Sequence, residues 1–185
     1  AGRVEEQNQL RYGELVLEQS RRRAQPGPDV AEILRKRILE SNWWRDQEAQ
    51  FQRWQMRHHW AKTADPNLNA LPGMEQWLEE ICLKATSLED LKGQRWGECV
   101  PAHVRRRLME LVPEAIQLTP RRRVEVHYDQ SQKPWIASKL VDFFGLAQGP
   151  QLASGRIPLV LQLLAPNFRP VQITEDLAGF WQRHY

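Results

Sequence analysis

The chain has 185 residues, which is enough for one ordinary hydrophobic core or two small ones. Hydrophobic residues make up 41% of the sequence and charged residues 26%, so wholesale disorder is disfavoured. The 26 basic and 23 acidic residues leave a formal net charge of +3, a modest excess that is not the footprint of a dedicated nucleic-acid-binding arm.

Cysteine usage and hydropathy bear on the compartment. Cys82 and Cys99 form neither a CxxC metal-ligand pair nor a disulfide framework, which is typical of a reducing compartment. No run approaches the roughly 18 to 20 apolar residues of a membrane span, and the N-terminus has no hydrophobic signal core. We therefore expect a cytoplasmic protein without a membrane partner. The chain lacks an initiator Met and its last predicted helix has no C-cap, so we expect a fragment of something larger.

The N-terminal part, residues 1–25, is predicted to be the end of a β-rich region followed by a linker. Residues 11–17 have the β-branched and aromatic character of a short strand, which needs partner strands. Residues 21–23 are three arginines, and the proline-interrupted stretch up to Pro28 follows them. This composition is typical of a charged linker, and we place a module boundary there.

Residues 26–112 are predicted to form a helical bundle. Asp29 with Glu32 three residues later resembles a capping box, and Ser87 with Asp90 has the same spacing. Apolar side chains recur at helical spacing through the segment and predict five helices. They are Val30, Ile33, Leu34 and Ile38; Trp44, Phe51, Trp54, His58 and Ala61; Met74, Trp77, Leu78 and Ile81; Leu88 and Leu91; and Val104, Leu108 and Leu111.

The period changes in residues 113–185, which we predict to be an α+β C-terminal module. Residues 123–128 alternate between polar and apolar side chains, as a half-buried strand does. A turn over residues 129–134 follows. Ile136, Leu140, Val141 and Phe144 then line one face of a predicted helix that Gly145 can terminate.

The stretch from Gly155 onwards holds the longest apolar run. Residues 157–164 are apolar apart from one Gln, which predicts a strand covered on both faces. Two prolines enforce a turn over residues 165–170, and residues 171–173 predict a short strand. The last helix is predicted with Thr174 as its N-cap. Its apolar face is Leu177, Trp181 and Tyr185. The predicted fold class is therefore α+β, with a helical bundle, a small mixed α/β module and a short β segment at the N-terminus.

Catalytic machinery is not evident in the sequence. The phosphate-binding pattern GxxxxGK[ST] and the Asp-Glu-x-His box do not occur. His58 and His59 are adjacent, so on a helix they point about 100° apart and cannot share a metal ion. Cys82 lies beside an apolar face and has no evident base. We therefore predict no catalytic residue, no metal site and no cofactor within the chain.

Three arginine triplets are the best functional candidates, because Arg pairs with phosphate and stacks on unpaired bases. Residues 105–107 are predicted on a solvated helix face, with one Arg reaching an acidic neighbour, and residues 21–23 in a linker. Residues 121–123 lead into a strand that could present two guanidinium groups together. Most Trp residues occupy predicted core positions, with Trp135 as the exception. The predicted nucleic-acid-binding residues are Arg121, Arg122, Arg123, Arg156, Arg169 and Trp135.

A family resemblance adds to this interpretation. Residues 155–166 (GRIPLVLQLLAP), 169–177 (RPVQITEDL), and the aromatic residues of the last helix closely resemble the C-terminal domain of the HrpB-type bacterial ATP-dependent RNA helicases of the DEAH-box class. The similarity extends back through residues 143–145, 123–128 and 108–113. It continues more loosely through residues 76–78, 87–88 and 11–17.

The resemblance implies a parent protein that couples ATP hydrolysis to movement along nucleic acid. Its tandem motor domains, with their ATP and Mg²⁺ sites, would lie upstream of Ala1, so no catalytic residue is carried over to this chain. The first 20 residues would end a β-rich region, for which an OB-like fold is one interpretation. This chain has TPRRR at residues 119–123, where the family usually has a Pro-Ser/Thr-Gly-Ser-Arg turn. The family's basic, aromatic tail after the final helix is absent.

Two functional hypotheses follow from these observations. The first is an accessory C-terminal domain that supports the helicase core of the same polypeptide and guides single-stranded RNA. The second is a protein-interaction or structural module that docks on the helicase core or on a separate protein partner. An independent enzyme is disfavoured, since no nucleophile–base pair or metal-ligand set was found.

Overall fold

The computed structural model describes residues 2–184 and has the predicted α+β fold. It divides into two compact units, one from residues up to Gln52 together with Pro72–Val100, and the other from Arg53–Leu71 together with Pro101 onwards. The helix α2 contributes residues to both units. The predicted module boundaries at residues 25 and 112 stay a prediction.

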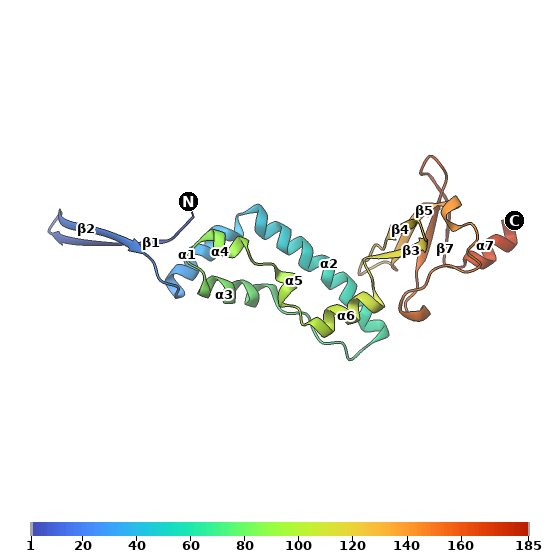
Figure 1. Ribbon diagram of the computed structural model, residues 1–185, viewed down its shortest axis with the longest axis horizontal. Coiled ribbons are helices and arrows are strands. Elements are labelled where there is room, and N and C mark those ends of the chain that lie inside the picture. The colour runs from blue at the N-terminus through green and yellow to red at the C-terminus, as the bar shows by residue number, and fades with distance from the viewer. Residues whose placement is uncertain (1, 185) are drawn as a thin grey trace. The chain divides into compact units, whose positions relative to one another are not determined.

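A β-hairpin opens the first unit. Strand β1 (Glu5–Tyr12) pairs antiparallel with β2 (Leu15–Arg23), and every residue of both strands is exposed. Figure 1 shows the hairpin as a ribbon that extends away from helices α1, α3 and α4. Its base is tied to the helices through the Val4 N–H, which donates to the Thr86 carbonyl at 3.1 Å.

The hairpin corrects two predictions. The single strand over residues 11–17 is wrong because Gly13, with φ 59°, turns the chain in its middle. The linker at residues 21–23 is also wrong, because these arginines continue β2 opposite β1. Arg22 lies opposite Glu6 and forms an ion pair with it at 2.9 Å, so cross-strand charge pairing extends the strand.

Helices form the rest of the first unit. Its core is built from buried apolar side chains of α1, α3 and α4 and from Ala24 and Ala85. The predicted capping box at Asp29 is wrong, because Gly27 is the N-cap and makes no side-chain bond. The predicted box at Ser87 is confirmed, since the Asp90 N–H donates to Ser87 Oγ and the Ser87 N–H donates to the Asp90 carboxylate. The helices are α1 (Pro28–Leu39), α2 (Asn42–Ala64), α3 (Met74–Lys84), α4 (Leu88–Lys92) and α5 (Trp96–Cys99).

The second unit combines helix α6 with five strands and a last helix. A hairpin of β3 and β4 precedes a three-stranded sheet of order β5-β6-β7, in which β5 and β6 are parallel and β6 and β7 antiparallel. Its elements are α6 (Ala102–Leu111), β3 (Ala115–Thr119), β4 (Arg122–Glu125), β5 (Trp135–Lys139), the 3₁₀ helices η1 (Leu140–Phe143) and η2 (Ala153–Gly155), β6 (Val160–Leu164), β7 (Pro170–Thr174) and α7 (Leu177–His184).

The predicted helix over residues 136–144 is wrong. The chain forms strand β5 and the short η1 there, because β5 pairs with β6 along its whole length. Ile136 and Ser138 are buried and alternate with half-buried neighbours, which is the period of a strand. Central strand β6 begins at Val160, so the predicted strand over residues 157–164 is confirmed only in its second half.

The start of the last helix also differs from its prediction. Asp176, rather than Thr174, accepts a first-turn N–H, since its Oδ1 bonds the Gly179 N–H at 2.8 Å. Leu177 and Phe180 are the buried side chains of α7. The predicted packing role of Tyr185 lies outside the described residues.

Arg57 anchors the second half of α2 to the segment that leads into β3. This side chain is only 7% exposed, and its Nε donates to the Val112 carbonyl at 2.8 Å. Its Nη1 pairs with Glu114, also at 2.8 Å. Burial lowers the pKa of Arg57 and raises the pKa of the nearby Tyr128 phenol, which donates to the Pro113 carbonyl. The sequence carried no signal for this buried cation.

Candidate nucleic-acid interface

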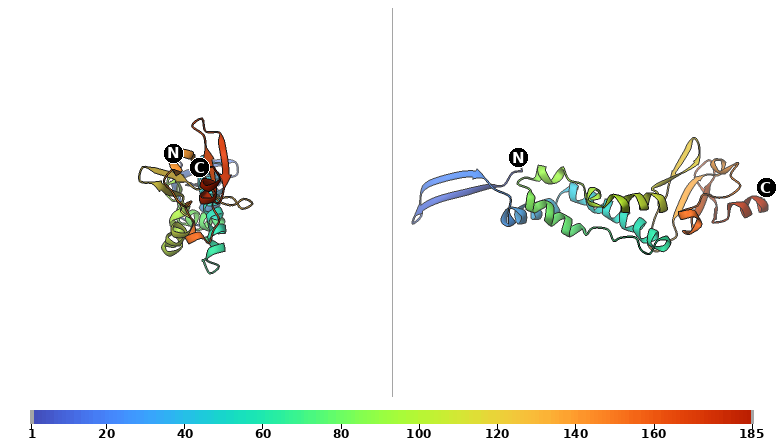
Figure 2. Two further views of the ribbon diagram at one scale, coloured as in Figure 1. Left: turned by 90° about the vertical axis from the view of Figure 1, so that its right-hand side faces the viewer. Right: turned by 60° about the horizontal axis from the view of Figure 1, so that its bottom comes forward.

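One end of the C-terminal sheet gathers several cationic side chains. Strands β5 and β6 end there and β7 begins, because β5 is parallel to β6 and β7 is antiparallel. Strand β4 begins at the same end, since Arg122 reaches Ser138 near the end of β5 while His127 pairs with Trp135 at its start. Figure 2 shows the strands and turns of this unit from two sides. We call this region the basic end, defined by Arg121, Arg122, Arg123, Lys139 and Arg169.

The arginine triplet provides three of these cations. Arg121 lies in the turn between β3 and β4, and the next two arginines begin β4. Val124 is buried, so Arg122 shares its inward face while Arg123 points to the opposite face. Arg122 donates to Ser138 Oγ at 3.1 Å and lies 3.4 Å from the Asp142 carboxylate. Arg121 and Arg123 form no ion pair with the part of the chain that the structure describes.

Arg169 lies in the turn between β6 and β7, next to Phe168. Its backbone N–H donates to Asn167 Oδ1 at 3.2 Å, and its guanidinium makes no hydrogen bond or ion pair with the part of the chain that the structure describes. Lys139, the last residue of β5, lies with its Nζ 4.6 Å from the centroid of the Phe168 ring. The exposed Phe168 ring thus has the Lys139 ammonium beside it and Arg169 as its neighbour in the sequence.

Trp135 and Arg156, the other two predicted residues, lie elsewhere. Trp135 begins β5 at the opposite end of the sheet, and its ring stacks on His127 with centroids 4.0 Å apart. Arg156 donates from Nε to the Ala153 carbonyl at 3.0 Å and from Nη1 to the Ala64 carbonyl at 2.8 Å. Ala64 ends α2, so this guanidinium caps a helix C-terminus. The structure therefore places four of the six predicted residues at the same end of the sheet.

Sequence reasoning missed Lys139 and Phe168. Lys139 lies within the incorrectly predicted helix, and a helix there gives no reason to expect a contact with Phe168. Phe168 lay in a segment that was correctly predicted as a turn. The available signal is an aromatic residue directly before an arginine within that turn. A large side chain in a turn has few neighbours to pack against.

The other arginine triplets are occupied or scattered. Arg107 pairs with Asp65 at 2.8 Å and with Glu110 at 3.1 Å, which confirms the prediction of one Arg reaching an acidic neighbour. Its guanidinium, by hydrogen bonding, lowers the pKa of Asp65. Arg105 and Arg106 are exposed on α6. No group of three metal-ligating side chains occurs among residues 2–184.

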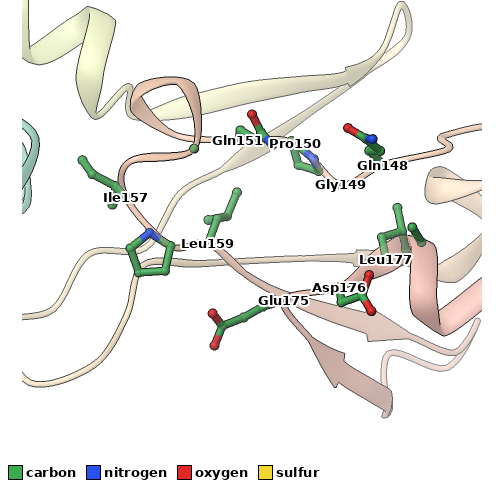
Figure 3. Close-up of a pocket in the computed structure, with 12 residues that line it drawn as sticks. Gln148, Gly149, Pro150, Gln151, Ile157, Leu159, Glu175, Asp176 and Leu177 are labelled. Atoms are coloured by element: carbon green, nitrogen blue, oxygen red, sulfur yellow. The ribbon is translucent and has the colours of Figure 1, made fainter.

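A hollow of about 390 Å³ lies near the start of α7 (Figure 3). It is bounded by the loop around Gly149 and by Glu175 and Asp176, which lead from β7 into α7. Glu175 pairs with Lys133 at 2.7 Å, and Asp176 caps the helix. Its two carboxylates repel phosphate, so this hollow does not extend the basic end. None of the described helices is long and apolar enough to span a bilayer.

Comparison with known proteins finds relatives of one kind. The family model described as "HrpB_C: ATP-dependent helicase C-terminal" matches residues 77–185. The ATP-dependent RNA helicase HrpB of Escherichia coli K12 is 32% identical over 137 residues, which cover 72% of this chain and 17% of that protein.

Two solved structures are similar over 95% of this chain. The crystal structure of the E. coli DExH-box NTPase HrpB has a TM-score of 0.60 at 24% identity, with 23% of its chain covered. The crystal structure of the E. coli DEAH/RHA helicase HrpB has a TM-score of 0.62 at 25% identity, with 24% covered. The chain thus spans less than a quarter of the length of each relative.

Proposed function

The chain belongs to the HrpB family of ATP-dependent helicase C-terminal domains, and from this premise we propose that it is an accessory domain that guides single-stranded RNA for a motor elsewhere in the same polypeptide. ATP and Mg²⁺ would bind in that motor, outside this chain. The protein would act in the cytoplasm.

The basic end is the observation that carries the RNA-guiding role. It presents five cations from three separate segments, and among the described residues Asp142 is the acid paired with them. Arg121, Arg123 and Arg169 are exposed, so phosphates can reach them without displacing an ion pair. The guanidinium of Arg122 is anchored by Ser138 and Asp142, which holds the strand and its turn in place.

A salt titration of RNA binding tests this role. The full chain is titrated with a fluorescent single-stranded oligoribonucleotide, and affinity is measured by anisotropy at several salt concentrations. Three to five phosphate contacts predict a slope of log affinity against log salt of about −2 to −4. Absence of binding at low salt contradicts the proposal.

A charge-matched pair of variants locates the contact. Arg121→Glu with Arg123→Glu removes two exposed cations of the basic end and leaves Arg122 in place. Arg105→Glu with Arg106→Glu makes the same charge change on α6. The first double variant should reduce the steepness of the slope by about 1.4, which is two contacts at about 0.7 each, while the second leaves it unchanged. If both double variants reduce the slope equally, net charge alone determines the binding, and the basic end is rejected as the RNA site.

The exposed hairpin supports a second part of the proposal, docking on the helicase core. Its stem is polar on both faces, while the apolar side chains gather at its tip. An isolated two-stranded hairpin is marginal in water, so a partner surface would stabilise it. The exposed tip residues are Leu10, Tyr12, Leu15, Val16 and Leu17.

Hydrogen exchange on the full-length protein tests the docking. Amides of β1 and β2 should exchange much more slowly in the full-length protein than in this fragment. Leu15→Glu with Leu17→Glu should remove that protection, whereas Gln7→Glu with Gln19→Glu on the polar stem should not. Equal exchange in both proteins would remove the hairpin as a docking element.

A further inference from the structure

Phe168 occupies a position that packing does not explain. The residue is 66% exposed, and its backbone is left-handed, with φ 63°. A bulky side chain is unfavourable in this region of backbone space, where glycine or asparagine is preferred. Neither burial nor local conformational preference therefore accounts for a phenylalanine here.

The turn around Phe168 holds this conformation from both sides. The Phe168 N–H donates to the Ala165 carbonyl at 2.9 Å, and the Ala165 N–H donates to the Arg169 carbonyl at 2.9 Å. The Asn167 side chain accepts the Arg169 N–H, and Pro170 begins β7 with its φ restricted by the ring. The ring is consequently presented outward from a turn that strands β6 and β7 fix at its two ends.

Lys139 orients the ring and places positive charge beside it. Its ammonium lies 4.6 Å from the ring centroid, within the range of a cation–π contact. Arg169 directly follows Phe168 in the sequence. Its guanidinium makes no hydrogen bond or ion pair with residues 2–184. An exposed aromatic ring with one cation at its face and another on the next residue combines a surface for a base with partners for phosphates.

We propose that Phe168 stacks on an unpaired base of single-stranded RNA, with Lys139 and Arg169 binding the flanking phosphates. This rests on the proposed RNA-guiding function and adds a stacking contact to it. Stacking needs an unstacked base with a free face, which a duplex does not offer, so the site selects single strands. Lys139 and Arg169 place positive charge next to the ring, which favours a polyanion over a protein partner, although Val171 and Ile173 of β7 are also exposed.

Variants of Phe168 and an abasic oligonucleotide separate stacking from charge. Anisotropy is measured with the full chain and with two oligoribonucleotides of equal length, one with bases and one abasic at its central positions. Phe168→Leu keeps an apolar side chain without a π face, and it should weaken binding of the base-containing strand about tenfold, or about 1.4 kcal/mol. Its affinity for the abasic strand should not change. Phe168→Trp should retain or strengthen base-dependent binding.

Controls exclude a loss of folding and an unspecific apolar effect. Ile173, an apolar residue of β7 that is 57% exposed, provides a matched control, and Ile173→Ala should leave both affinities unchanged. The melting temperature of Phe168→Leu should equal that of the native chain or be slightly higher. Phe168→Gly should be at least as stable, because glycine suits the left-handed backbone, and yet bind RNA as weakly as Phe168→Leu.

The outcomes distinguish this inference from the proposed function. If the native chain binds neither strand, both fall. If binding depends on Arg121 and Arg123 but Phe168→Leu binds the base-containing strand as well as the native chain does, only stacking is overturned. Stacking is also overturned if Phe168→Leu weakens binding of the abasic strand as much as binding of the base-containing strand.

Discussion

Replacing Arg57 with methionine tests how the second half of α2 is held to the segment before β3. Methionine keeps an unbranched apolar stem of similar length but has no donor for Val112 and no charge for Glu114. Val112 is buried, whereas the Glu114 side chain is 70% exposed, so the two hydrogen-bond partners of the Arg57 guanidinium lie in different environments. They should therefore contribute unequally.

The magnitude follows from these exposures. The buried bond to the Val112 carbonyl is charge-assisted, and such bonds contribute about 1.5–3 kcal/mol. The bond to Glu114 faces water and contributes up to about 1 kcal/mol. These contributions are already net of the cost of desolvating the guanidinium, the same cost that lowers the pKa of Arg57. Arg57→Met should thus lower the free energy of unfolding by about 2 kcal/mol, and Glu114→Gln by less than about 1 kcal/mol.

Urea unfolding followed by circular dichroism and tryptophan fluorescence measures both changes. Arg53 lies one helical turn earlier and is exposed, so Arg53→Met provides a control that should stay within about 0.5 kcal/mol of the native chain. The reasoning is refuted if Arg57→Met behaves like this control. It is refuted equally if Glu114→Gln costs as much as Arg57→Met, because the solvent-exposed ion pair would then dominate the anchor.

Three further predictions concern capping, pH and backbone strain. Ser87→Ala removes the N-cap hydroxyl of α4 and should lower the free energy of unfolding by about 1 kcal/mol in urea titrations, with no loss if the cap is dispensable. Asp65 has its pKa lowered by the guanidinium of Arg107, so its contribution is present above the unfolded-state pKa of about 4 and is lost as pH falls through the lower folded-state value. The melting-temperature difference between the native chain and Asp65→Asn should therefore shrink below about pH 4, and a difference that grows on acidification would contradict the assignment. Ser154, with φ 57°, and Gly155, with φ 84°, are both left-handed, so Ser154→Gly should preserve or raise the melting temperature while Gly155→Ala lowers it by an amount equivalent to about 1 kcal/mol.

Local patterns predicted the helical half of the chain better than its strands. The apolar spacing of Val30, Leu34 and Ile38 and the cap at Ser87 are encoded within a few residues, and both appear in the structure, although Ile33, predicted on the same face, is 55% exposed. Strand β5 is different, because Ile136 and Phe144 also fit a helical period. What decides its conformation is pairing with β6, which lies more than 20 residues further along the chain.

The same reason limited prediction of the candidate interface. The basic character of residues 121–123 is visible in the sequence, but their neighbours at the basic end come from other strands. Arg156 was a reasonable candidate by composition, yet a non-local contact with the end of α2 engages its guanidinium. Lys139 and Phe168 are brought together by the β5–β6–β7 topology and have no common signal in the sequence.

The assignment of α2 to two units has a consequence for biosynthesis. The partners of its first half are complete once Val100 has left the ribosome, but Arg57 and Trp60 bind carbonyls of Val112 and Asp129. At a translation rate of about 5–20 residues per second, the second half of the helix waits roughly 4 to 14 seconds for these acceptors. During that interval a nascent chain exposes a helix face meant for burial. Chaperone binding should therefore be greatest for nascent chains that end between Val100 and Asp129.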